Sequence, residues 1–168
     1  MSDAYLEHVR TFAAYNRWAN ARLYDACAGL PDAEYRRDRG AFFGSIHGTL
    51  NHILVADRIW LGRIEGRDSG LKQLDAILFE DFAGLRAARE AEDARIVALA
   101  DGLDAARLGS DLAYATTSGA PQSTPLRAVL AHVFNHQTHH RGQAHDLLFQ
   151  IGKTAPELDL IYFLRERI

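Results

Sequence analysis

Residues 131–144 read Ala131-His132-Val133-Phe134-Asn135-His136-Gln137-Thr138-His139-His140-Arg141-Gly142-Gln143-Ala144, and no proline interrupts them. Each residue of an α-helix turns by about 100°, so residues four apart lie above one another on one face. His132, His136 and His140 have this spacing. Two imidazoles so placed can bind one divalent cation from one side and leave positions for a third ligand and for water.

The apolar residues of the same segment indicate which histidines point inward. They gather on one arc of the helix, which is expected to face a core: Val129, Val133, Ala144, Leu147 and Ile151. His140 falls inside this arc and His136 at its near edge, whereas His132 and His139 lie further out. Helical geometry therefore favours His136 and His140 as the inward pair. The alternative, that these are surface or hydrogen-bonded core histidines, stays open.

Composition predicts one globular domain over residues 1–168. The chain has 168 residues, 48% of them hydrophobic and 24% charged, which is an ordinary globular balance. The net charge of −3, without a basic block, argues against binding to nucleic acid or to a membrane surface. No apolar run approaches the roughly 18 residues of a membrane helix, and the first residues lack the apolar core of a signal peptide, so we expect a cytoplasmic protein. Cys27, the only cysteine, is expected to be a small helix residue rather than a nucleophile.

Apolar periodicity predicts three further long helices, at about Asp3–Gly29, Ser45–Glu65 and Asp81–Ala100. The histidine helix is expected to begin with Thr124 as its N-cap and Pro125 in its first position, and to end near Gln150. Before it, residues 101–124 are rich in turn formers and predict a short helical turn, followed by a short hairpin or an ordered loop around Tyr114. A short closing helix is expected at 157–165.

Four long helices with this insertion predict an all-α four-helix bundle. The chain has no glycine-rich phosphate loop, no nucleophile elbow and no His-Glu-x-x-His motif. A mononuclear histidine site between helices is the chemistry that remains. The second long helix offers His47 and His52, which point about 140° apart, and its apolar residues do not choose between them. Asp57 on that helix is expected either to orient a histidine or to face solvent.

Four motifs carry a family resemblance: Tyr15-Asn16-Arg17-Trp18-Ala19-Asn20, Thr49-Leu50-Asn51-His52-Ile53-Leu54-Val55-Ala56-Asp57-Arg58-Ile59-Trp60-Leu61, Asn135-His136-Gln137-Thr138-His139-His140-Arg141-Gly142-Gln143 and Leu158-Asp159-Leu160-Ile161. They are spread over nearly the whole chain, and His-x-x-x-His-Arg-Gly-Gln is the most specific run. The combination resembles the DinB/YfiT-like family of bacterial metal-binding four-helix bundles.

This resemblance implies one divalent cation, often nickel or zinc, held by His52, His136 and His140. It assigns no role to His47, His132 or His139. Some similar proteins are thiol S-transferases, so the resemblance implies a metal-dependent enzyme that acts on a small-molecule substrate, either a transferase for a low-molecular-weight thiol or a hydrolase. No catalytic side chain can be named.

The resemblance also implies a homodimer. Asn16 and Arg141 are expected to bind an anionic part of the substrate if they reach the mouth of the bundle, and otherwise to be surface residues or to form hydrogen bonds between helices. The competing hypothesis is a non-catalytic, metal-stabilised dimeric bundle of a damage-inducible stress response. A fourth protein ligand that closes the site would favour that hypothesis.

Overall fold

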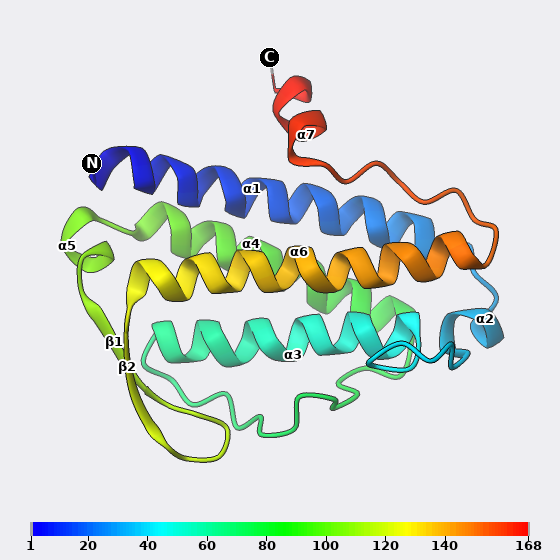
Figure 1. The fold of residues 1–168 in the computed structure, drawn as a ribbon, viewed down its shortest axis with the longest axis horizontal. Helices are drawn as coiled ribbons and strands as arrows, with labels where there is room; N and C mark the ends of the chain where they lie inside the picture. Colours follow the sequence, from blue (N-terminus) through cyan, green and yellow to red (C-terminus); the bar gives the residue numbers. More distant parts are fainter. Residues whose placement is uncertain (1, 168) are drawn as a thin grey trace.

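Four long helices make up most of the structure, a computed structural model that describes residues 2–167 (Figure 1). They are α1 (Ser2–Cys27), α3 (Ile46–Ile64), α4 (Phe82–Gly102) and α6 (Leu126–Gln150). Short helices and one antiparallel strand pair occupy the connections: α2 (Asp32–Arg36), α5 (Ala105–Leu108), β1 (Asp111–Ala115), β2 (Pro121–Pro125) and α7 (Leu160–Glu166). The predicted all-α four-helix bundle, with a loop-rich insertion before the last long helix and a closing helix, is confirmed, and the insertion contains the β1–β2 hairpin.

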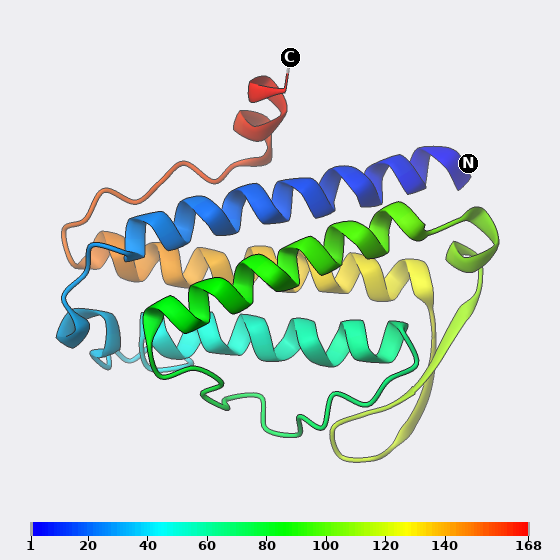
Figure 2. The same ribbon diagram turned by 180° about the vertical axis from the view of Figure 1, so that it is seen from behind.

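The order of the helices requires one long return connection. Helix α1 packs against α4 and α6, and α3 packs against the same two helices. In Figures 1 and 2, α1 and α6 run in one direction and α3 and α4 in the other. Because α3 and α4 are consecutive and parallel, residues 65–81 travel back along the whole length of α3 before α4 begins. This connection carries Leu74 to the side of His52.

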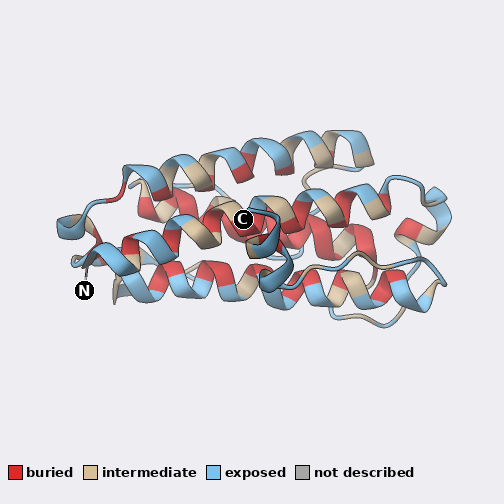
Figure 3. Cartoon of the chain, turned by 90° about the horizontal axis from the view of Figure 1, so that it is seen from above, coloured by how far each residue is buried: buried red, intermediate tan, exposed pale blue. Residues whose placement is uncertain are grey.

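Two apolar clusters fill the bundle, and a layer of buried polar side chains separates them. One cluster lies at the hairpin end and includes Leu61 and Leu126; the other lies at the α2 end and includes Leu54 and Leu85. All four long helices contribute to the polar layer: Asn16, Asn20, Asp57, Arg89, Asp93, Gln137 and Arg141. Figure 3 shows the buried faces turned toward the bundle interior. Within the described chain, no helix is both long and apolar enough to cross a membrane.

Side-chain caps explain where two of the long helices begin. The Ser45 hydroxyl accepts a hydrogen bond from the Gly48 N–H, as expected for the N-cap of α3. The Asp81 carboxylate accepts from the Gly84 N–H in the same way at α4. Both caps satisfy N–H groups that the first turn of a helix leaves without partners.

Two predicted helix starts are wrong. Helix α6 begins at Leu126, and Pro125 stands in its N-cap position without a side-chain hydrogen bond. The reason is that Thr124 pairs with Leu112 in the β1–β2 ladder, which holds Thr124 in an extended conformation. The closing helix begins at Leu160, after the extended backbone of Asp159, and not at Glu157.

Candidate metal centre

Three histidines from two packed helices converge on one point. His52 comes from α3, and His136 and His140 come from successive turns of α6. The Nε2 atom of His52 lies 3.1 Å from Nε2 of His136 and 3.2 Å from Nε2 of His140. One ligand atom of each side chain falls within 4.8 Å of the others. We call these three residues the histidine triad; they are the same three that the family resemblance implies.

Backbone and amide oxygens fix which nitrogen of two triad rings carries the proton. Nδ1 of His52 lies 2.7 Å from the Leu74 carbonyl oxygen, and Nδ1 of His140 lies 2.8 Å from Oε1 of Gln143. These oxygens only accept hydrogen bonds, so each neutral ring carries its proton on Nδ1. Its Nε2 atom is then a lone pair that points at the common centre.

The triad geometry fits a divalent cation. Nε2 of His52 and Nε2 of His140 present lone pairs to each other across 3.2 Å with no proton between them, which is unfavourable unless a cation lies there. Two nitrogens bound to one cation at about 2.0–2.1 Å are roughly 2.8–3.4 Å apart in octahedral or tetrahedral geometry. The distances from His52 to His136 and to His140 fall in that range, and imidazole nitrogen suits zinc, nickel, copper or iron.

Burial keeps the triad neutral at physiological pH. Desolvation, with a smaller contribution from His140, lowers the pKa of His52 to about 4 even though the hydrogen bond to Leu74 opposes the change. Desolvation and the neighbouring histidines lower the pKa of His136 to about 3. The pKa of His140 is lowered mainly by burial. A histidine must be deprotonated to bind a metal, so all three rings are prepared for this role.

A loop residue packs on the ring of His52. Phe43 stacks on it with ring centroids 3.7 Å apart and an interplanar angle of 18°. The close passage of this loop over α3 requires Gly48, because a Cβ there would lie 2.1 Å from the Phe43 carbonyl oxygen. Phe43 therefore orients His52 and shields one face of its ring from water.

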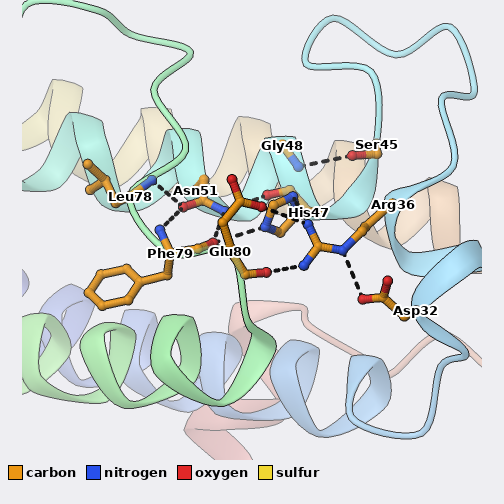
Figure 4. A network of polar contacts seen from close by, with 9 residues as sticks. All are labelled: Asp32, Arg36, Ser45, His47, Gly48, Asn51, Leu78, Phe79 and Glu80. Atoms are coloured by element: carbon orange, nitrogen blue, oxygen red, sulfur yellow. Dashed lines mark hydrogen bonds and ion pairs between the residues drawn. The ribbon is translucent and has the colours of Figure 1, made fainter.

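The connection 65–81 is tied to α3 by Asn51 (Figure 4). The Asn51 amide donates to the carbonyl oxygens of His47 and Phe79, at 3.1 and 3.2 Å. Its oxygen accepts from the N–H groups of Leu78 and Phe79, at 2.9 and 3.1 Å. His47 joins this anchor, since its Nε2 lies 3.0 Å from the Phe79 carbonyl. The structure thus separates His52, which reaches the triad, from His47, which does not.

Replacing Asn51 with leucine is expected to loosen this anchor and weaken metal binding together. Each buried N–H or C=O left without a partner costs about 1–3 kcal/mol, so the free energy of unfolding should fall by roughly 2 kcal/mol or more. Metal affinity should fall about 10–100-fold, the usual effect of losing an outer partner of a ligand, because Leu74 lies on the released segment. Denaturant unfolding and metal titration measure the two effects.

The matched control is Gln150→Leu, which removes an exposed amide that donates to Asp146. It should change neither quantity measurably. If Asn51→Leu lost stability but kept full metal affinity, Leu74 would be held by other contacts and the anchor would not support the triad.

The other polar residues that the sequence singled out, Asp57, Asn16 and Arg141, lie in the polar layer. Asp57 accepts from Arg89 at 2.6 Å and also from Gln137, so the prediction that it orients a histidine or faces solvent is wrong. Arg141 donates to Asn16, and both side chains are buried. The structure therefore gives this pair the hydrogen-bonding role between helices, while a role in substrate binding stays a prediction. The buried thiol of Cys27 has its pKa raised to about 12 by burial, in agreement with an inert helix residue.

Two cavities adjoin the triad, and both are lined by His52 and His136. The first, which we call the triad cavity, has a volume of about 700 Å³ and is lined by His140, Phe43 and Asp75 among others. The second has a volume of about 310 Å³ and is lined by Trp60, Arg63, Tyr114 and His132 in addition; we call it the Trp60 cavity. The triad is accordingly open to small molecules, and no fourth protein ligand from residues 2–167 closes it.

The sequence alone did not reveal several residues that build this site. Leu74 acts through its backbone carbonyl, which leaves no trace in residue identity. Phe43 and Gln143 had weak signals: the glycine at 48 inside a helix, and the spacing of Gln143 three residues after His140. Trp60 and Arg63 lie one turn apart at the end of α3, and nothing in the sequence beyond their aromatic and basic character indicated that they line a cavity beside the triad.

Comparisons with known proteins place these observations among related chains. A sequence model of the DinB family matches residues 1–167. The chain is 27% identical over 158 residues to Protein DinB of Bacillus subtilis (strain 168), a match that covers 89% of this chain and 90% of that protein. The crystal structure of a DinB-like protein from Bacillus cereus ATCC 10987 has a TM-score of 0.64 at 19% identity and covers 83% of this chain and 89% of its own. At that identity the structural match shows a shared fold.

Proposed function

The chain belongs to the DinB family, and we propose that it is a metal-dependent enzyme that activates a thiol or a water molecule at His52, His136 and His140. The observation that carries this proposal is the convergence of unprotonated Nε2 atoms on one point with open cavities beside it. A purely structural metal site would be expected to be closed by a fourth protein ligand.

A divalent cation such as zinc or nickel, held by three neutral nitrogens, would stabilise a thiolate or hydroxide at neutral pH. The chain supplies the surroundings for that chemistry. Leu74 and Gln143 fix the tautomers of His52 and His140, and Phe43 shields one face of His52. Asp75 lines the triad cavity, and its carboxylate can accept the proton that a bound thiol or water gives up.

The test is whether a thiol reaches the cation. Protein loaded with cobalt(II) and titrated with phenylmethanethiol is expected to develop the near-ultraviolet absorption of a cobalt–thiolate bond. His136→Ala should lose the band, and His132→Ala should keep it, because His132 lies outside the triad. Turnover would then be sought by adding electrophiles and following the loss of free thiol.

The non-catalytic alternative predicts a different result. One cation per chain, with no thiolate band and no exchangeable water, would mean that the metal only stabilises the bundle. In that case a homodimeric scaffold in a stress response becomes the better hypothesis, and sedimentation analysis of the metal-loaded chain tests its dimer.

A further inference from the structure

Arg63 lacks a carboxylate partner within the described chain although it lies in a region rich in ion pairs. Its neighbour Arg67 pairs with Glu65, and Arg95 binds Glu65 at 2.6 Å. The Arg63 guanidinium instead lies over two rings, 4.5 Å from the centroid of Trp60 and 4.9 Å from that of Tyr114. A half-buried cation that is held in place but not neutralised is a candidate for binding an anion from outside the chain.

This cation faces the space that leads to the triad. Arg63 lines the Trp60 cavity, as do His52 and His136. It also lines a further cavity of about 570 Å³ between the connection 65–81 and the tip of the β1–β2 hairpin, which includes Lys72. The Trp60 cavity thus adjoins the triad through His52 and His136, and it adjoins the further cavity through Arg63. The further cavity, with Arg63 and Lys72 in its lining, is basic.

The wall between the triad and Arg63 is mainly apolar. Its lining includes Ala56, Ile59 and Trp60 of α3, together with Leu74 and Tyr114. Trp60 also meets His132 edge to face, with centroids 5.0 Å apart, which closes the side toward α6. A volume of about 310 Å³ accommodates one small flat or aliphatic group.

We propose that Trp60, Tyr114 and Arg63 form a specificity subsite for a substrate of the triad, one that carries a flat apolar group ending in a carboxylate or another anionic group. The apolar part occupies the Trp60 cavity and the anion pairs with Arg63. This inference rests on the proposed function, because the opposite end of the same molecule is the group activated at the triad.

Two matched thiols test the subsite through affinity. Phenylmethanethiol and 4-(sulfanylmethyl)benzoate differ only in a carboxylate, and each is titrated into cobalt-loaded protein while the cobalt–thiolate band is followed. The carboxylated thiol should bind the wild type roughly tenfold more tightly or better, the usual contribution of a hydrogen bond to a charged group. Arg63→Met should abolish that advantage and leave the affinity for phenylmethanethiol nearly unchanged.

Arg127→Met is the matched control, because it removes the same charge from an exposed position on α6 that lines none of these cavities. It should preserve the full advantage of the carboxylated thiol. Equal affinity of the wild type for both thiols, or an advantage that survives Arg63→Met, would overturn the proposed subsite.

A second measurement separates failure of the subsite from failure of the proposed function. The chain has two tryptophans, and the Trp18 indole donates to Glu166 outside these cavities, so its N–H signal is an internal reference. In NMR spectra of the metal-free protein, 4-methylbenzoate should shift the Trp60 indole signal and not the Trp18 signal, and Arg63→Met should remove the shift. That result supports the subsite even if no thiol binds the metal, whereas an unmoved Trp60 signal at high ligand concentration contradicts it.

Discussion

Replacing His136 with alanine is expected to lower the affinity for a divalent cation by more than a hundredfold while the bundle stays folded. Loss of an outer partner of a metal ligand already costs about 10–100-fold, and His136 is a direct member of the triad with its Nε2 atom 3.1 Å from that of His52. The substitution also removes a ring that is only partly buried, so helical content should survive. Calorimetric titration of the metal-free variant with zinc and nickel gives the affinity, and circular dichroism gives the fold.

His132→Ala is the control for that experiment. His132 precedes His136 by one turn of α6, with ring centroids 5.7 Å apart, but it does not reach the triad. Its loss should leave metal affinity within a fewfold of the wild type. If His132→Ala weakened binding as strongly as His136→Ala, the ligand set would differ from the triad.

Replacing Arg89 with methionine is expected to cause the largest loss of stability, about 3–5 kcal/mol, since it leaves buried carboxylates without their cation. Arg89 lies in the polar layer, 2.6 Å from Asp57 and 2.9 Å from Asp93, and all three side chains are almost inaccessible to water. The loss should appear as a lower free energy of unfolding in denaturant. Arg86→Met, on the same helix but in exposed pairs with Asp25 and Glu90, should cost less than about 1 kcal/mol.

The deficit of Arg89→Met should shrink as the pH falls. Even beside Arg89, burial raises the pKa of Asp57 to about 6, above its usual value of 3.8, and removal of the cation raises it further. A carboxyl whose pKa is raised on folding favours the folded state at low pH and opposes it as the pH rises through the folded pKa. Unfolding measured at pH 5 and at pH 8 should therefore show the smaller difference from wild type at pH 5. An equal deficit at both would mean that lost packing, not unpaired charge, destabilises the variant.

The sequence alone predicts the long helices and two of the three triad histidines, because rules that act within a single helix determine them. Apolar periodicity located the four long helices, and Ser45 was recognisable as a cap. The spacing of His136 and His140 placed both on the inward arc of one helix, since a single helix fixes that geometry.

The third histidine and the polar layer depend on how helices and connections pack against one another, which the sequence of a single helix does not determine. Both histidines contact the connection 65–81, His47 at the Phe79 carbonyl and His52 at the Leu74 carbonyl, but only His52 also reaches α6 and the triad. The family resemblance selected His52, whereas apolar residues surround that helix almost completely and gave no preference. The partner of Asp57 comes from α4, 32 positions along the chain, so the polar layer was not foreseeable from the α3 sequence.

The measurement that tests the central claim most directly is X-ray absorption of the tag-free chain purified with its native metal, together with elemental analysis. The proposed site predicts about one divalent cation per chain, surrounded by three imidazole nitrogens at about 2.0–2.1 Å and by one or more exchangeable oxygen ligands. A folded chain that stays empty after incubation with zinc and nickel would contradict the proposed metal site. A cation enclosed by four or more protein ligands would contradict its open, catalytic character.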